Sequence, residues 1–253
     1  MLSIAGSDSG GGAGIQADLK AFAACGVHGM TAITAITAQN TMSVSAVHQV
    51  PPPVIVEQVR QVSEDIGVDA VKIGMLGDVA TIDAVARALQ HVGEAPVVLD
   101  PVMVAESGAP LLADDARDAL RDSLLPLAAV TTPNLAEAEV LAGTAGSAEE
   151  LARAIHALGP KAVVVTGGHR DEGATDVFFD GERLEEIPGE RYEGGAAHGS
   201  GCTHSSALAA CLAHGDAPLE AARKAKKVAA RAVSQGLRDI GEGAGPVDVL
   251  GLA

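Results

Sequence analysis

Near its start the chain has the sequence Leu2-Ser-Ile-Ala-Gly-Ser-Asp-Ser-Gly-Gly-Gly-Ala-Gly-Ile-Gln-Ala-Asp18, and this stretch decides the fold. Residues 2–6 are apolar or small and predict a short buried strand, whereas residues 7–14 are rich in glycine and serine and predict a loop. Residues 15–25 carry an apolar face and predict a helix. A strand, loop and helix in direct succession indicate an α/β protein.

The same alternation continues along the chain. It predicts strands at 30–37, 70–74, 96–100, 129–132 and 162–166, another near 45–50, and a hairpin at 175–180 and 183–187. It predicts helices after the three prolines 51–53 up to about 66, and at 79–91, 114–124, 135–141, 148–158 and 218–235. This order favours a largely parallel sheet covered on both faces. Since no composition break divides the chain, we expect residues 1–253 to form one domain.

Composition excludes several classes of protein. The formal net charge of −16 argues against binding to nucleic acid or to an anionic membrane, because both require basic surfaces. Apolar residues make up 47% of the chain, yet no run is long enough to cross a membrane, and the N-terminus lacks a signal peptide. The three cysteines lack disulfide or zinc spacing, which favours reduced thiols. We therefore expect a cytoplasmic protein.

A second glycine-rich stretch, His198-Gly-Ser-Gly-Cys-Thr-His-Ser-Ser206, leads into an alanine-rich run. Small residues before a helix leave free backbone amides beside the positive end of the helix dipole, and such sites bind phosphates. The same field favours the thiolate of Cys202, which makes this residue a candidate for proton transfer. Alternatively, the stretch is only a tight turn and Cys202 a small core residue.

Polar residues follow most of the predicted strands. Because ligands bind beyond the carboxyl ends of parallel strands, we expect these residues to face one site. They are the loop 6–14, Gln39 and Asn40, Gly74 and Met75, Asp100, Asn134 and Glu137, and residues 167–169.

Gly12-Ala-Gly-Ile-Gln-Ala17 also fits the dinucleotide-binding pattern GxGxxA. This match is weak, because Gln39 and Asn40 stand where an acid would hold the ribose, and the chain has no P-loop motif. The loop glycines more plausibly let the backbone approach a small ligand. Asp18, early in the next helix, either accepts hydrogen bonds from that ligand or only complements the helix dipole.

Seven motifs, in this order and spacing, resemble the hydroxymethylpyrimidine/phosphomethylpyrimidine kinases of thiamine biosynthesis, members of the ribokinase-like superfamily. They are residues 4–20, Thr37-Ala-Gln-Asn40, Lys72-Ile-Gly-Met-Leu76, Val98-Leu-Asp-Pro-Val-Met103, Thr132-Pro-Asn-Leu-Ala-Glu137, Gly167-Gly-His169 and Gly199-Ser-Gly-Cys-Thr203. The resemblance implies a three-layer α/β/α fold with a mostly parallel sheet, usually as a homodimer. It implies transfer of the γ-phosphoryl group of ATP to the alcohol of 4-amino-5-hydroxymethyl-2-methylpyrimidine, and then to the resulting monophosphate.

The resemblance also implies which residues surround the pyrimidine. These are Gly6, Asp18, Thr37, Gln39, Met75 and Val102. The residue types suit this substrate, because an amide or carboxylate can match the ring nitrogens and the amino group, and Met75 and Val102 offer apolar surfaces. Gln39 favours hydroxymethylpyrimidine over pyridoxal, since relatives that act on pyridoxal look less polar there.

On the ATP side, the resemblance places Asp100 and Glu137 near Mg²⁺, which keeps waters and uses few carboxylates. It places Asn134, Thr166, Gly168 and Lys226 at the nucleotide, with residues 223–228 bordering the adenine. The amides of Gly199, Ser200, Gly201 and Cys202 would neutralise the transferred group. Cys202 would be the base for the alcohol, whereas the monophosphate is already ionised and needs none.

The chain departs from the family pattern at two positions. Many members have lysine where this chain has Thr166, and many have lysine in the loop that here contains Glu106. Two other functions therefore stay open. One is a pyridoxal kinase or a kinase for both substrates, and the other is a weakened protein that binds the pyrimidine as a sensor.

Overall fold

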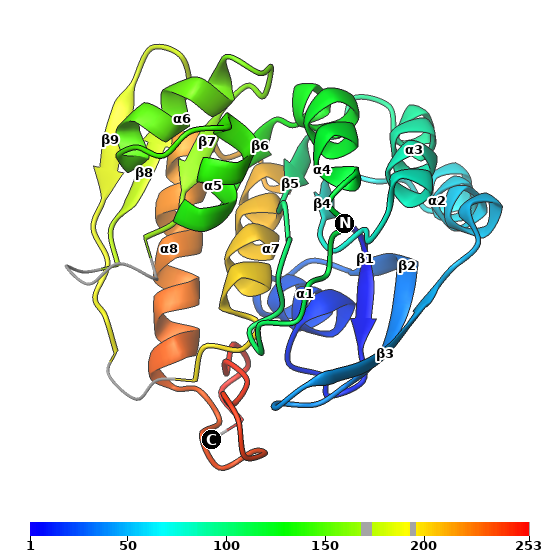
Figure 1. Ribbon diagram of the computed structural model, residues 1–253, viewed down its shortest axis with the longest axis horizontal. Coiled ribbons are helices and arrows are strands. Elements are labelled where there is room, and N and C mark those ends of the chain that lie inside the picture. Colours follow the sequence, from blue (N-terminus) through cyan, green and yellow to red (C-terminus); the bar gives the residue numbers. More distant parts are fainter. Residues whose placement is uncertain (168–173, 193–195, 253) are drawn as a thin grey trace.

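The computed structural model of the chain describes residues 1–167, 174–192 and 196–252 (Figure 1). Within these residues the strands form one nine-stranded sheet in the order β3-β2-β1-β4-β5-β6-β7-β8-β9. Pairing is parallel from β2 through β7 and antiparallel at both edges. The strands are β1 (Leu2–Asp8), β2 (Met30–Gln39), β3 (Val44–Gln49), β4 (Val71–Ile73), β5 (Val97–Leu99), β6 (Val130–Thr131), β7 (Val163–Val165), β8 (Asp176–Phe179) and β9 (Leu184–Ile187).

Helices cover both faces of this sheet (Figure 1). On one face lie α1 (Gly14–Ala24), α7 (Ser200–Ala213) and α8 (Pro218–Ser234). On the other lie α2 (Pro52–Asp65), α3 (Val79–Ala88), α4 (Ala116–Ala119), α5 (Leu135–Ala142) and α6 (Ala148–His156). The predicted three-layer α/β/α arrangement is thus confirmed.

Strand β5 shows why the sheet needs both layers. Val98 packs in the core under α1, α7 and α8, whereas its neighbours Val97 and Leu99 pack in the core on the opposite face. Successive side chains of a strand point to opposite faces, so a strand of three apolar residues must be covered on both sides. The central strands are short, and their carboxyl ends open directly into loops.

Local sequence sets the helix ends. Asn134 and Glu137 form a reciprocal capping box at the start of α5, and Ser147 and Glu150 form another at α6. The predicted helix 114–124 instead divides into α4 and a wider turn at Leu120–Leu124. The predicted hairpin is confirmed as β8 and β9. None of the helices in the described ranges is long and apolar enough to cross a bilayer.

Candidate active site

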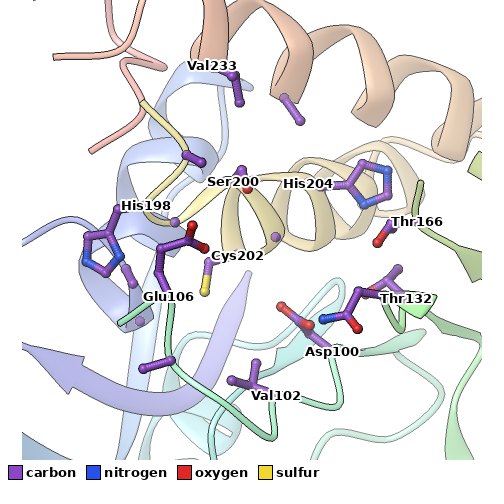
Figure 2. A pocket seen from close by; sticks show the side chains of 18 of the residues that line it. Asp100, Val102, Glu106, Thr132, Thr166, His198, Ser200, Cys202, His204 and Val233 are labelled. Carbon is purple, nitrogen blue, oxygen red and sulfur yellow. The ribbon is translucent and has the colours of Figure 1, made fainter. Parts of the chain in front are cut away.

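A cleft of about 400 Å³ opens where the loops after β1, β2, β4, β5, β6 and β7 meet α7 and α8. At this edge of the sheet the sequence predicted that the polar residues following the strands would meet. Figure 2 shows the side chains of Asp100, Thr132, Thr166, Cys202 and His204 converging on it. Among the predicted site residues, those lining it are Gly6, Thr37, Gln39, Met75, Asp100, Val102, Asn134, Glu137, Thr166, Gly199, Ser200, Gly201, Cys202 and Lys226. Gly168, also predicted, lies outside the described residues.

The turn before α7 presents an anion-binding site to the cleft. Gly199 has a φ of +82°, and a Cβ there would lie 1.9 Å from Gly12 O, so only glycine fits. The Ser200 N–H donates to Ala197 O, and thus it is not free to bind a ligand. The amides of Gly201 and Cys202 have no acceptor in the part of the chain that the structure describes. Two free amides at the positive end of α7 form the site.

His198 and Asp8 connect this turn to the first glycine-rich loop. His198 Nε2 lies 2.9 Å from Asp8 Oδ2, which also accepts from the Gly12 and Ala13 amides, while Oδ1 accepts from the Gly10 amide. Burial acts to raise the pKa of Asp8, but the bonds from His198 and the amides outweigh it and lower the pKa. Sequence analysis missed this pair. An acid inside a glycine-rich loop is the signal that could have revealed it.

The structure corrects the prediction for Asp18. Its side chain is completely buried below the cleft floor and is not part of the lining. It accepts hydrogen bonds from Ser3 Oγ at 2.6 Å, Ser206 Oγ at 2.8 Å and Lys72 Nζ at 2.9 Å. Asp18 is on the buried face of α1, where it anchors Lys72 at the cleft floor.

Lys72 is the functional candidate that sequence analysis overlooked, although its motif was recognised. Lys72 borders the floor of the cleft, although its side chain has no solvent-exposed surface. Its Nζ lies 3.8 Å from Asp100 Oδ2. Burial alone would lower its pKa, but Asp18, Cys202 and Asp100 together raise it above its ordinary value. Lys72 is therefore a permanent positive charge at the cleft floor.

The Cys202 thiol points into the cleft from the first turn of α7 (Figure 2). Desolvation raises its pKa from 9.0 to about 12, although Lys72 and a hydrogen bond from the Gly14 amide act in the opposite direction. The expectation that the helix field favours the thiolate is therefore wrong for the resting protein. The nearby carboxylates of Asp18 and Asp100 add to the rise in pKa.

Two buried acids, Asp100 and Glu137, face the cleft beside one another. Burial and the charge of Asp100 raise the pKa of Glu137 from 4.5 to about 8, and burial likewise raises the pKa of Asp100. Both Glu137 oxygens accept backbone amides, from Asn134 at 3.0 Å and Met103 at 3.3 Å. Within the described residues no group of three or more His, Cys, Asp or Glu could hold a metal ion. The pair suits a cation that arrives with other ligands of its own.

Asn134 and Thr166 lie at the other end of the cleft, where β6 and β7 end. The Thr166 N–H donates to Pro133 O at 2.9 Å, which joins the two strand ends. From α8, Lys226 Nζ donates to Asp176 Oδ1 at 2.6 Å. Lys226 is the residue of the basic segment 223–228 that lines the cleft.

The opposite end is small and mostly apolar. Met75 and Val102 line it together with Gly6, where an added Cβ would lie 3.0 Å from the Met75 sulfur. Thr37 Oγ1 lies 2.9 Å from Ser7 O and 3.1 Å from Gln39 Oε1, so its single proton is shared between these two acceptors. Within the described residues the Gln39 side-chain nitrogen has no acceptor, so the amide can present a donor to the cleft. Glu106 reaches over this end from the loop after β5 (Figure 2).

A mostly parallel α/β/α sheet with free helix-terminal amides beside buried acids and a lysine defines a small-molecule phosphotransferase of the ribokinase-like fold. The chain belongs to the phosphomethylpyrimidine kinase family, whose model matches residues 8–248. It is 52% identical to the hydroxymethylpyrimidine/phosphomethylpyrimidine kinase of Rhizobium meliloti over 97% of this chain and 95% of that protein.

Solved structures agree with this assignment. An ADP complex of Bacillus subtilis pyridoxal kinase superposes with a TM-score of 0.90 at 40% identity, covering 99% of this chain and 97% of that one. Phosphomethylpyrimidine kinase of Clostridium difficile gives a TM-score of 0.79 at 41% identity, covering 89% and 95% of the two chains. The protein is therefore an enzyme, a kinase whose structural relatives include pyridoxal kinases.

Proposed function

We propose that this enzyme transfers the γ-phosphoryl group of ATP to 4-amino-5-hydroxymethyl-2-methylpyrimidine, and then a second one to the monophosphate. One observation carries the proposal. The cleft places the Cys202 sulfur beside the free amides of Gly201 and Cys202, with the polar Gln39 among apolar side chains at the substrate end. The names of the related proteins support the same reaction.

In the first reaction the substrate hydroxyl oxygen attacks the γ-phosphorus, the bond to the β-phosphate oxygen breaks, and ADP leaves. The hydroxyl proton passes to the Cys202 sulfur. Because the pKa of Cys202 is raised to about 12, few molecules carry the thiolate at neutral pH. That thiolate, however, is a stronger base than an ordinary one. The Gly201 and Cys202 amides stabilise charge on the transferred group, and Lys72 stabilises the thiolate.

In the second reaction the nucleophile is a phosphate oxygen. A phosphate monoester is ionised near neutral pH, so no base is needed. We expect Cys202 to matter for the alcohol and hardly at all for its monophosphate.

ATP would bind together with Mg²⁺, which would neutralise part of the charge on its phosphates. Asp100 and Glu137 would hold it, mainly through water, because Mg²⁺ typically takes only one or two protein carboxylates. A cation would also relieve the repulsion between these two buried acids. Asn134, Thr166, Gly168 and Lys226 would border the nucleotide.

We further propose a cytoplasmic homodimer with residues 1–253 forming one domain in each subunit. Exposed apolar side chains lie on the edge strand β3 and on the two elements next to it, namely Val47 on β3, Ile36 on β2 and Val54 on α2. Such an edge is a surface that a second copy would cover. Sedimentation equilibrium at several concentrations tests this, and a monomer at all of them would contradict it.

A pyridoxal kinase, or a kinase for both substrates, is the second candidate, because the Bacillus subtilis pyridoxal kinase shares the fold so closely. One assay decides between the functions. Purified protein is given Mg²⁺-ATP with the hydroxymethylpyrimidine, its monophosphate or pyridoxal, and products are identified by mass spectrometry. We expect mono- and diphosphate of the pyrimidine at higher kcat/KM than pyridoxal phosphate. Binding without any product would instead indicate a sensor.

A further inference from the structure

His204 lies on the second turn of α7 and lines the nucleotide end of the cleft, although only 4% of its surface is exposed. Figure 2 shows its ring opposite the Thr166 hydroxyl, with Asp100 and Thr132 on the same side of the cleft. Thr203, the preceding residue, is completely buried. The imidazole is thus the side chain by which this turn of α7 meets the cleft.

Neither ring nitrogen of His204 has a hydrogen-bond partner among the residues that the structure describes. Nε2 lies 3.5 Å from Asp176 Oδ2, and that oxygen is unpartnered there too. An unsatisfied buried polar group costs on the order of 1–3 kcal/mol, so such groups normally meet a partner at some stage of function. A ring buried against the core could not meet a ligand, whereas the His204 ring faces the cleft and can.

The buried Asp176 has hydrogen-bond donors other than the histidine. Its Oδ1 accepts from Lys226 Nζ at 2.6 Å and from the Gly167 amide at 2.9 Å. Lys226 is bonded to this carboxylate, and β7 is followed by Thr166, whose side chain carries no charge. Among the described residues, the side-chain donors left near a phosphate chain in this part of the cleft are neutral groups such as Thr132, Asn134 and Thr166. His204 lines this part of the cleft, and neither of its ring nitrogens has a hydrogen-bond partner among the described residues.

We propose that His204 donates a ring N–H to a phosphate oxygen of the bound nucleotide and so helps to hold its phosphate chain. This inference rests on the proposed function only in taking a nucleotide as the ligand. It assigns to α7 a side-chain contact in addition to the two free amides at its start.

The test measures nucleotide binding by isothermal titration calorimetry, with the ATP analogue AMP-PCP, ADP and adenosine as probes. His204→Leu removes the donor but keeps an apolar group of similar size. We expect it to weaken AMP-PCP and ADP binding by about 10- to 100-fold, the effect of one hydrogen bond to a charged group. Adenosine, which lacks phosphates, should bind within about twofold of the original protein.

Two further variants make the result specific. His204→Leu combined with Thr166→Lys places a cation on the opposite wall, and we expect it to recover most of the lost AMP-PCP affinity. His91→Leu changes an exposed histidine far from the cleft and should leave all three affinities unchanged. Thermal unfolding of each variant shows that the comparison is made between folded proteins.

Equal AMP-PCP affinity in His204→Leu and the original protein would overturn the proposal, as water or Asp176 would then be the sole partner of the ring. Equal losses for AMP-PCP and adenosine would also overturn it, because the ring would then shape the pocket or touch the base. Failure of the proposed function looks different. The protein would bind AMP-PCP in a His204-dependent way but phosphorylate no pyrimidine.

Discussion

Lys72 Nζ lies 2.9 Å from Asp18 Oδ1, and both side chains are completely buried between the sheet and α7. On its other side Lys72 faces Asp100, at 3.8 Å, and the Cys202 thiol. One cation is therefore held by an acid below the cleft while it acts on a thiol within the cleft. An acid in the first helix can affect the chemistry without touching the substrate.

We predict that Lys72→Met destabilises the protein by about 3–5 kcal/mol, because it leaves Asp18 as a buried charge without its partner. The free energy of unfolding, from urea denaturation, measures this. Lys72→Met combined with Asp18→Asn removes both charges and should recover part of the loss. Lys161→Met, at an exposed lysine, should change stability by less than about 0.5 kcal/mol. No recovery in the double variant would contradict the charge argument.

Cys202→Ala should lower kcat/KM for the hydroxymethylpyrimidine by about 100-fold or more and change kcat/KM for the monophosphate by less than about threefold. Only the alcohol has a proton to lose in the reaction. Because the pKa of the thiol is raised to about 12, the rate with the alcohol should rise with pH between 7 and 9 in the original enzyme. Steady-state kinetics with each substrate provide both measurements. Equal losses with both substrates would refute a role in proton transfer.

Much of the fold followed from local sequence. Alternating apolar runs and helical patterns predicted every strand within a few residues, and resemblance to known kinases supplied the layers. The least accurate prediction was the helix 114–124, where the structure has the short α4 and a wider turn at Leu120–Leu124. Periodicity alone does not distinguish these helical forms, because residues at similar spacing stay on one face in both.

The site was only partly predictable. Residues after strand ends met in one cleft because parallel strands end at the same edge. Asp18 could not be placed correctly, since its partners Lys72 and Ser206 are 54 and 188 residues away. The state of Cys202 was missed for a similar reason. Its thiol pKa depends on burial by distant segments, and that outweighs the helix dipole, which was the local signal.

Gly199→Ala should destabilise the protein and abolish the anion site. Its Cβ would meet Gly12 O at 1.9 Å, and the φ of +82° is unfavourable for alanine. We expect a loss of at least about 2 kcal/mol in unfolding free energy. Gly201→Ala is the matched comparison for stability, because an added Cβ there meets no atom of the described residues within 4 Å. Similar unfolding temperatures for the two variants would contradict this reading of the turn.

Glu137 should make the stability of the Mg²⁺-free protein depend on pH. Its pKa is about 8 when folded and 4.5 in an unfolded chain, so between these values the folded protein holds a proton that the unfolded chain releases. Raising the pH through this window therefore lowers stability, by up to about 5 kcal/mol. Glu137→Gln should flatten this part of the pH profile, and Glu139→Gln should leave it intact. Urea denaturation at several pH values tests this, and a profile unchanged by Glu137→Gln would contradict it.

Gln39 should set the preference between pyrimidine and pyridoxal. Its side-chain oxygen lies 3.1 Å from the Thr37 hydroxyl, which also contacts Ser7 O at 2.9 Å, and its side-chain nitrogen can donate to an acceptor on the substrate. Gln39→Leu puts a branched apolar group in place of the amide and so removes the donor. We expect kcat/KM for the hydroxymethylpyrimidine to fall about tenfold, the effect of one hydrogen bond whose buried partner is left unmatched, with a smaller loss for pyridoxal.

Gln90→Leu, at an exposed glutamine outside the cleft, should change neither value. If Gln39→Leu reduced both substrates equally, the amide would serve to hold the β2 end in place, and the discrimination would have to come from Met75 and Val102.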